Sequence, residues 1–384
     1  MADNKDKKAL NVPALRFPEF CGEWEKCKFG DIATGFDYGM NAAAKPYDGQ
    51  NKYIRITDID EASSTYNNED VVSPDGTLSE NYTVNERDIL LARTGASTGK
   101  SYLYRKSDGK LYYAGFLIRA NIAEHNPYFV FSQLHTHRYW RWVSIMSARS
   151  GQPGINSQEY ASFPIYTTTL IEENKISTLL SLIDERIATQ NKIIDKLETL
   201  IKGIRHKVFR QLRKDFGFNS TIGDILSFEQ PQRYIVSSAE YSNDDTFIPV
   251  LTANKAFILG YTTETDGIYD KGDCIIIDDF TLDCKYVSFP FKVKSSAIKI
   301  LTASNKFILR YTYEYLKSLE LSTEEHKRHY IAEIQPYSCV LPDENTLKTI
   351  ALVFENLAYK LANEQSLALI LNKQRQYLLS KMFI

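Results

Sequence analysis

The sequence has no apolar run long enough to cross a membrane. No stretch approaches the roughly 18 consecutive apolar residues that a membrane-spanning helix needs. Its first residues, MADNKDKKALN, are polar and lack the apolar core of a secretion signal. We therefore expect a cytoplasmic protein with no membrane partner.

Metal-binding and disulfide patterns are also missing. The five cysteines have no CxxC spacing, which favours free thiols over disulfides or zinc: Cys21, Cys27, Cys274, Cys284 and Cys339. The six histidines form no ligand set. We therefore predict that the chain binds no metal.

Signatures of catalysis are absent as well. Adenine methylation would require an Asn/Asp-Pro-Pro-Tyr/Phe motif, and the nearest segment, Asn126–Phe129, lacks one proline. No glycine-rich loop for S-adenosylmethionine follows a strand, and no Ser-His-Asp order is compelling. We expect no catalytic residue and no cofactor bound by this chain. The net charge of −2 neither indicates nor excludes a nucleic-acid partner.

What the sequence does contain is the same long helix twice. From Ile176 to Val208, residues at spacings of four and three form an apolar series typical of a coiled-coil seam. Adding 174 to each number gives a second series, from Ile350 to Met382. Both series carry a polar residue at the same step, Gln190 and Glu364. We predict that the helices pair and that these two side chains fix the register, the alternative being that both point to solvent.

The repeat extends to the modules that precede the helices. Phe29–Ile32 matches Ile222–Ile225 at an offset of 193, and Arg87–Leu91 matches Gly272–Ile276 at an offset of 185. The 25 Tyr and 20 Phe favour β-rich modules. Strands are expected at 52–56, 89–92, 101–104, 112–120, 247–251, 274–277, 285–289 and 297–300, and helical spacing at 128–146 and 306–319. Each half is therefore predicted to be an α+β module followed by a helix.

These patterns divide the chain into five segments. They are a flexible N-terminus (1–14), a first domain (15–168), a first long helix (169–214), a second domain (215–342) and a second long helix (343–384). Residues 213–220 are expected to form a connector, and Asp343 to cap the second helix.

Several segments, in this order, carry a family resemblance over nearly the whole chain. They are Leu15–Phe20 leading to Trp24, the Gly-Asp-Ile of each module, the loop Arg93–Lys100, Asp278–Thr281 before Lys285 and Tyr286, and the two seamed helices. Together they resemble the specificity (S) subunit of a type I restriction–modification enzyme. The resemblance implies two target-recognition domains with pseudo-twofold symmetry, separated by two long helices packed as an antiparallel coiled coil.

The resemblance also implies a function and partners. Each domain would read one half of a split, asymmetric target in double-stranded DNA, and the subunit itself would be non-catalytic. It would join two modification subunits, which methylate adenine using S-adenosylmethionine, and restriction subunits, which cut DNA using ATP and magnesium. A pair of modules independently suits two half-sites about one duplex turn apart, roughly 34–36 Å. The alternative is a duplicated coiled-coil adaptor that organises proteins without reading bases.

Three loops offer side chains suited to DNA. The first follows a strand and contains Arg93, Thr94, Gly95, Ser97, Thr98 and Lys100, whose glycines permit close approach to a phosphate. It is not a P-loop, because Gly95 and Gly99 enclose three residues instead of four. A tight turn with a solvated lysine is the structural alternative.

The second loop lies at the 185 offset, where Arg93 aligns with Asp278, Thr94 with Asp279 and Lys100 with Lys285. Aspartate accepts from cytosine N4, so Asp278, Asp279, Thr281, Lys285 and Tyr286 are candidates. A catalytic carboxylate pair and a plain surface turn are the alternatives.

The third loop contains the candidates Arg149 and Gln152, and Lys327 and Arg328 are their counterparts by position in the second module. The alternative is that each segment is simply the loop that closes its module. Arg55, Asn254 and Lys255 are weaker candidates. Residues 217–342 contain 12 Lys/Arg and 17 Asp/Glu, a net charge of −5 (12 − 17). We therefore expect weak, salt-sensitive DNA binding by the chain alone.

Overall fold

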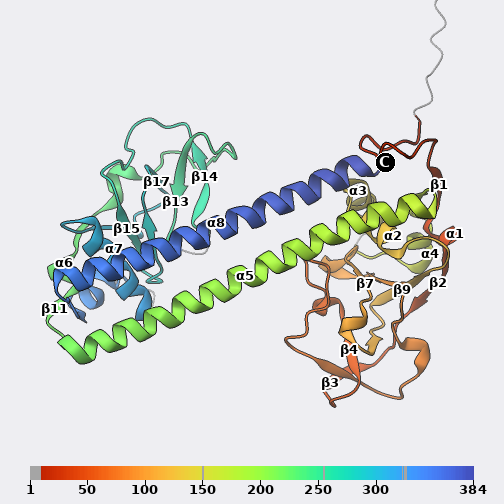
Figure 1. The fold of residues 1–384 in the computed structure, drawn as a ribbon, viewed down its shortest axis with the longest axis horizontal. Helices are drawn as coiled ribbons and strands as arrows, with labels where there is room; N and C mark the ends of the chain where they lie inside the picture. The colour runs from red at the N-terminus through yellow and green to blue at the C-terminus, as the bar shows by residue number, and fades with distance from the viewer. Residues whose placement is uncertain (1–9, 149–150, 254–255, 322, 324–326) are drawn as a thin grey trace, which may run out of the picture. The chain divides into compact units, whose positions relative to one another are not determined.

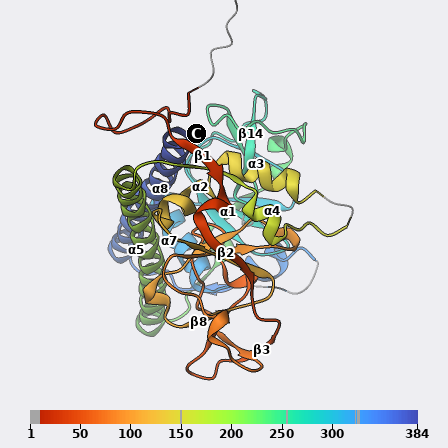
Figure 2. The same cartoon turned by 90° about the vertical axis from the view of Figure 1, so that its right-hand side faces the viewer.

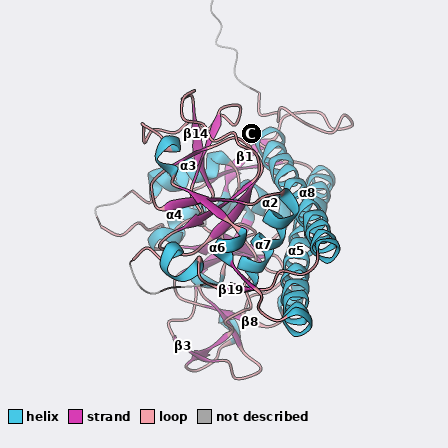
Figure 3. Ribbon diagram, turned by 90° about the vertical axis from the view of Figure 1, so that its left-hand side faces the viewer, coloured by secondary structure: helices cyan, strands magenta, loops and turns pink. Residues whose placement is uncertain are grey.

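The computed structural model describes residues 10–148, 151–253, 256–321, 323 and 327–384 (Figure 1). The chain divides into two compact units, Met1–Asn191 with Leu367–Ile384, and Lys192–Ser366. Each unit combines sheets and short helices with part of each of two long helices, a mixture that is visible in Figure 3. The predicted α+β class is confirmed. Among the described residues, no helix combines the length and apolar character that a membrane span requires.

The two long helices are α5 (Leu170–Phe216) and α8 (Glu344–Met382). In the first unit, Asp184 of α5 pairs with Arg375 of α8, while Ile176 packs in one cluster with Met382. From the first of these contacts to the second, the residue number decreases along α5 and increases along α8. The two helices therefore run antiparallel in this unit. Their seam positions are buried or half-buried throughout, as the coiled-coil spacing predicts.

The same antiparallel pairing is seen within the second unit. Gln365 Nε2 donates to Glu198 Oε1 at 3.3 Å, and the Arg205 guanidinium lies 5.9 Å from the Phe354 ring centroid. The two proposed register residues are not solvated side chains, because Gln190 is 6% exposed and Glu364 is half-buried. Their pairing with each other stays a prediction.

The ends of the long helices are set by particular residues. Asp343 Oδ1 accepts the backbone N–H groups of Asn345 and Thr346 at 3.1 and 3.0 Å, so the predicted cap is confirmed. The predicted connector at 213–220 begins too early, since α5 continues to Phe216. The helix ends at Gly217, whose φ of +66° suits a residue without a side chain.

The first unit is built on a four-stranded antiparallel sheet of order β2-β9-β6-β7, whose edge strand β2 is labelled in Figure 2. Its strands and helices are β1 (Glu25–Lys28), α1 (Phe29–Ile32), β2 (Ala33–Tyr38), β3 (Ala43–Pro46), β4 (Lys52–Ile54), β5 (Val72–Asp75), β6 (Asp88–Ala92), β7 (Ser101–Leu103), β8 (Leu111–Tyr113), β9 (Leu117–Ile122), α2 (Pro127–Gln133), α3 (His137–Met146), α4 (Ser157–Ala161) and β10 (Pro164–Thr167). The single strand predicted at 112–120 is two strands, because the chain turns where Leu117 N–H donates to Ala114 O at 2.8 Å.

The second unit repeats this plan with a sheet of order β12-β18-β15-β16. Its elements are β11 (Ser220–Thr221), α6 (Ile222–Ile225), β12 (Ser227–Glu229), β13 (Ile248–Leu251), β14 (Ile258–Thr262), β15 (Cys274–Asp278), β16 (Cys284–Val287), β17 (Lys292–Val293), β18 (Ile298–Thr302), α7 (Lys306–Ser318) and β19 (Ser338–Cys339). In each unit the first and last strands pair antiparallel, and a parallel pair, β4-β8 or β13-β17, lies in a smaller sheet. The helix with the Gly-Asp-Ile sequence, α1 or α6, follows the first strand, as the repeat predicts.

The predicted offset of 185 between the modules is one residue too small. Ile89 and Leu91 of β6 face the helices of their unit, as Ile275 and Ile277 of β15 do in theirs. The last pairs before the hairpins are Leu91–Ser101 and Ile277–Cys284, so the offset is 186 (277 − 91). A shift of one residue turns every side chain of a strand to the opposite face. The hairpin also differs, because nine residues (92–100) separate the Leu91–Ser101 pair and six (278–283) separate Ile277–Cys284. Lys100 is therefore not equivalent to Lys285.

Two buried glutamates at the start of α5 fasten the first module to the helix. Glu172 accepts from Arg16 Nε and Nη2, both at 2.7 Å, and from Trp24 Nε1 at 3.3 Å. Glu173 contacts His125 Nδ1 at 2.8 Å and accepts the N–H of Asn126 at 2.8 Å. The entry segment and the module are thus tied to the first turn of the helix.

The His125–Glu173 contact predicts a pH dependence of stability. The Glu173 carboxylate raises the pKa of His125 above its ordinary value. Its contribution is therefore complete below about pH 6.5, the unfolded value, and is lost as the pH rises through the raised folded value. We expect the first unit to lose stability over that range, and His125→Gln to remove the loss. Urea titrations followed by tryptophan fluorescence measure this unit, because it holds all three tryptophans; an identical pH slope in the variant would contradict the assignment.

Candidate nucleic-acid interface

In the first unit, two of the predicted DNA-binding loops lie against each other. The chain after β6 meets the segment before α4 through an isolated bridge between Thr94 and Gly154. Gly95 N–H donates to Pro153 O at 3.0 Å, and Ile155 N–H donates to Arg93 O at 2.9 Å. Gln152 is exposed beside Gly95. The loops at 93–100 and 151–156 therefore form one surface, which we call the β6-end surface.

The glycines and hydroxyls of the β6-end surface serve the fold more than a ligand. Gly99 is buried, and a Cβ on it would lie 2.7 Å from Val143 Cγ1. Its N–H donates to Ala92 O and its carbonyl accepts from Tyr139 Oη at 2.8 Å. Thr98 Oγ1 donates to Gly95 O at 2.8 Å. Packing therefore excludes the close approach of a phosphate to Gly99. Ser97 is half-buried in the same turn, and its contact with DNA stays a prediction.

Arg93 has a different environment. Its guanidinium lies 4.9 Å from the centroid of the Tyr38 ring. Tyr38 is 41% exposed, and its Oη accepts the N–H of Ser157 at 3.2 Å. Hydrogen bonding by Ser157 and, in addition, the Arg93 charge lower the pKa of Tyr38. A ring fixed at its hydroxyl end therefore lies against the half-buried arginine side chain.

Two other predicted cations of this unit are occupied by carboxylates. Arg55 pairs with Asp58 at 2.7 Å and with Asp70 at 3.2 Å, and these contacts raise its pKa. Lys100 lies 3.5 Å from Glu61 Oε2. Arg55 closes a short turn, so this arrangement favours a structural role. Lys100 could contact DNA only by breaking its ion pair with Glu61.

In the second unit, the two neighbouring aspartates differ in what they do. Asp278 Oδ1 accepts the N–H groups of Phe280 and Thr281, both at 2.9 Å, which makes a turn with Thr281 exposed on it. Asp279 is 1% exposed and pairs with Lys299, which is equally buried, at 3.1 Å. Asp279 Oδ1 also accepts the N–H of Tyr330 at 2.9 Å. The Asp279 carboxylate is therefore engaged by Lys299 and Tyr330 inside the fold and is not accessible to a base.

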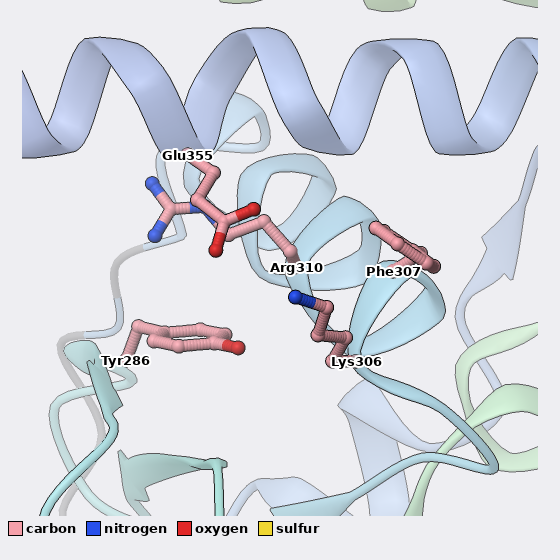
Figure 4. A pocket seen from close by; sticks show the side chains of 5 residues that line it. All are labelled: Tyr286, Lys306, Phe307, Arg310 and Glu355. Carbon is pink, nitrogen blue, oxygen red and sulfur yellow. The ribbon is translucent and has the colours of Figure 1, made fainter.

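The remaining candidates of this unit lie on or beside the same hairpin. Tyr286 Oη donates to Asp273 at 2.7 Å, and its ring faces Arg310 of α7 at 5.0 Å (Figure 4). The cavity lined by Tyr286, Lys306, Phe307, Arg310 and Glu355 holds about 20 Å³, room for a single water and not for a base. Lys285 is half-buried, whereas Lys327 and Arg328 are about half exposed near Glu333 and Asp279.

Three predicted residues, Arg149, Asn254 and Lys255, lie outside the described residues. Two residues that contact Arg93, Tyr38 and Phe116, were not among the predicted DNA-binding residues. Phe116 is 59% exposed, and its carbonyl accepts the N–H of Arg93 at 3.1 Å. An aromatic residue between two strands gives no signal of exposure by itself, so neither could be selected from the sequence. Within the described ranges, no cluster of His, Cys, Asp and Glu is suited to hold a metal ion.

Comparison with known proteins finds a family model that resembles the first half of the chain. A family model described as the type I restriction modification DNA specificity domain matches residues 22–199. These residues hold most of the first module and the start of α5.

Relatives and solved structures extend the likeness. The Escherichia coli "Type I restriction enzyme EcoR124I/EcoR124II specificity subunit" is 44% identical over 141 residues, which span 35% of this chain and 35% of that protein. The crystal structure of the type I restriction-modification system S subunit from M. genitalium aligns with a TM-score of 0.68 at 16% identity, over 97% of this chain and 99% of the other. The chain as a whole therefore has the fold of an S subunit.

Proposed function

We propose that this chain is the DNA-recognition subunit of a type I restriction–modification complex, and that it reads a bipartite, asymmetric target. The observation that carries the proposal is the duplication of one module. Two sheets of the same strand order each lead into a long helix, and the loops at their strand ends differ in length and charge. One frame with two different reading surfaces suits two half-sites of different sequence.

The proposed partners supply the chemistry that this chain lacks. Two modification subunits would methylate adenine with S-adenosylmethionine, and restriction subunits would cut DNA with ATP and magnesium. This chain would be non-catalytic and cytoplasmic, holding double-stranded DNA and its partner subunits together. The net charge of −5 on residues 217–342 (12 − 17) supports a division in which partners provide most phosphate contacts.

The proposal is tested by mapping methylated adenines in cells that express this chain with its modification partners and no other adenine methyltransferase. We expect one bipartite motif, two short sequences separated by a fixed number of unspecified bases. Omission of this chain should abolish the methylation. A protein adaptor that does not read bases would leave methylation without a motif, or with a motif that persists when the chain is omitted.

A further inference from the structure

We propose that Arg93, supported by Tyr38, reads a guanine in the half-site contacted by the first unit. This inference rests on the proposed function. It adds the identity of one reading side chain, of the residue that positions it, and of the base that it recognises.

The sheet topology brings the two side chains together. Tyr38 is the last residue of β2 and Arg93 follows the last residue of β6, while β9 lies between these strands. Tyr38 pairs with Ile118 of β9 and Ala92 pairs with Leu117, so both strands end at the same edge of the sheet. The residues are 55 positions apart (93 − 38), yet the guanidinium lies 4.9 Å from the ring centroid.

Arg93 also differs in its partners from several other arginines of this unit. Arg16, Arg55 and Arg119 of this unit are each paired with a carboxylate, Glu172, Asp58 and Asp37. Within the part of the chain that the structure describes, Arg93 forms no ion pair, and its buried Nε has no hydrogen-bond partner. Burying a donor without a partner costs free energy. A guanidinium that lies over an aromatic ring and is not engaged by a carboxylate suits guanine, whose O6 and N7 it can bind together.

The surroundings favour a base over a phosphate. A phosphate site offers free backbone N–H groups, but those of Gly95, Thr98 and Gly99 donate to Pro153 O, Gly95 O and Ala92 O. The Lys100 ammonium is already paired with Glu61. Exposed side chains beside Arg93 are of the kinds that contact base edges, a phenylalanine (Phe116) and a glutamine (Gln152).

The test uses the assembled complex and maps methylated sites. Arg93→Lys keeps the charge but loses the planar pair of donors, and Tyr38→Leu removes the supporting ring. For Arg93→Lys we expect the preference for guanine at one position of one half-site to fall on the order of tenfold, with the other half-site unchanged. Tyr38→Leu should act at the same position, while Tyr38→Phe, which keeps the ring, should retain most of the preference. Arg141→Lys, an exposed arginine on α3, is the matched control and should leave the motif intact.

Three results would overturn the inference. The first is that Arg93→Lys leaves the guanine preference unchanged. The second is that the half-site read by the first unit contains no guanine. The third is that the Arg93→Lys complex assembles but loses methylation equally at all sites. A uniform loss with a shallower dependence of binding on salt would identify Arg93 as a phosphate anchor. If the unaltered chain directs no bipartite motif, the proposed function fails. If it directs one that Arg93→Lys does not change, only this inference fails.

Discussion

Replacing Glu314 by alanine is expected to lower the free energy of unfolding of the second unit by about 3–5 kcal/mol. Glu314 of α7 is 1% exposed, and its carboxylate lies between two arginines. Oε2 pairs with Arg205 of α5 at 2.7 Å and Oε1 pairs with Arg310 at 2.7 Å. Arg310 Nη2 also donates to Phe354 O of α8 at 3.1 Å. Alanine would leave two largely buried cations without their counter-charge where α7 meets both long helices.

Hydrogen exchange of the β15 amides in the full chain measures this effect, because the tryptophans lie in the other unit and do not report on it. Lys202→Ala is the matched control. Lys202 stands on the same helix as Arg205 and pairs with Glu320, but both of these side chains are more than half exposed. The control should cost about 1 kcal/mol or less. A loss that small for Glu314→Ala would show that the pairs around Glu314 contribute little.

Asp279→Ala should have an effect of similar size, about 3–5 kcal/mol, for the same physical reason. The substitution would strand the buried Lys299 ammonium and remove the acceptor for the Tyr330 N–H. The same exchange measurement applies. Asp283→Ala is the control, because Asp283 is an exposed residue of the same hairpin, and surface changes of this kind stay within about 0.5 kcal/mol.

A second comparison separates folding from DNA recognition at Asp279. Because an ion pair can be replaced by apolar groups at little cost, Asp279→Leu combined with Lys299→Met should be less destabilised than Asp279→Ala. If Asp279→Ala instead folds with full stability and alters the methylated sequence, Asp279 is a reading residue and the structural assignment is wrong.

The long helices could be predicted from the sequence because their signal is local and repeated. Ten seam positions at regular spacing in each copy identify the buried face, and Asp343 marks one end. The predicted segments, 169–214 and 343–384, differ from the observed helices by at most two residues at each end. The contacts that hold the first turn of α5, such as Arg16 with Glu172, join distant residues and leave no periodic pattern in either segment.

The candidate site was harder to predict, since exposure and pairing decide what a polar residue does. Asp278 and Asp279 are adjacent and chemically identical, yet one shapes a turn and the other is buried against Lys299. The offset of 185 was wrong by one residue within the strands themselves, because a run of consecutive apolar residues does not show which side chains face the helices. The hairpins that follow differ by a further three residues (9 − 6). Tyr38 was missed because its partner, Arg93, is brought to it only by the sheet.

The central claim is that each module reads its own half of one target, and an exchange of modules tests it most directly. Residues 15–168 would be replaced by the corresponding segment of a relative with a different known target, in the complex with the modification subunits. We predict that methylome sequencing finds one half of the motif changed to that of the donor, with the other half and the spacing retained. An unchanged methylated sequence, or a change in both halves, would contradict the account.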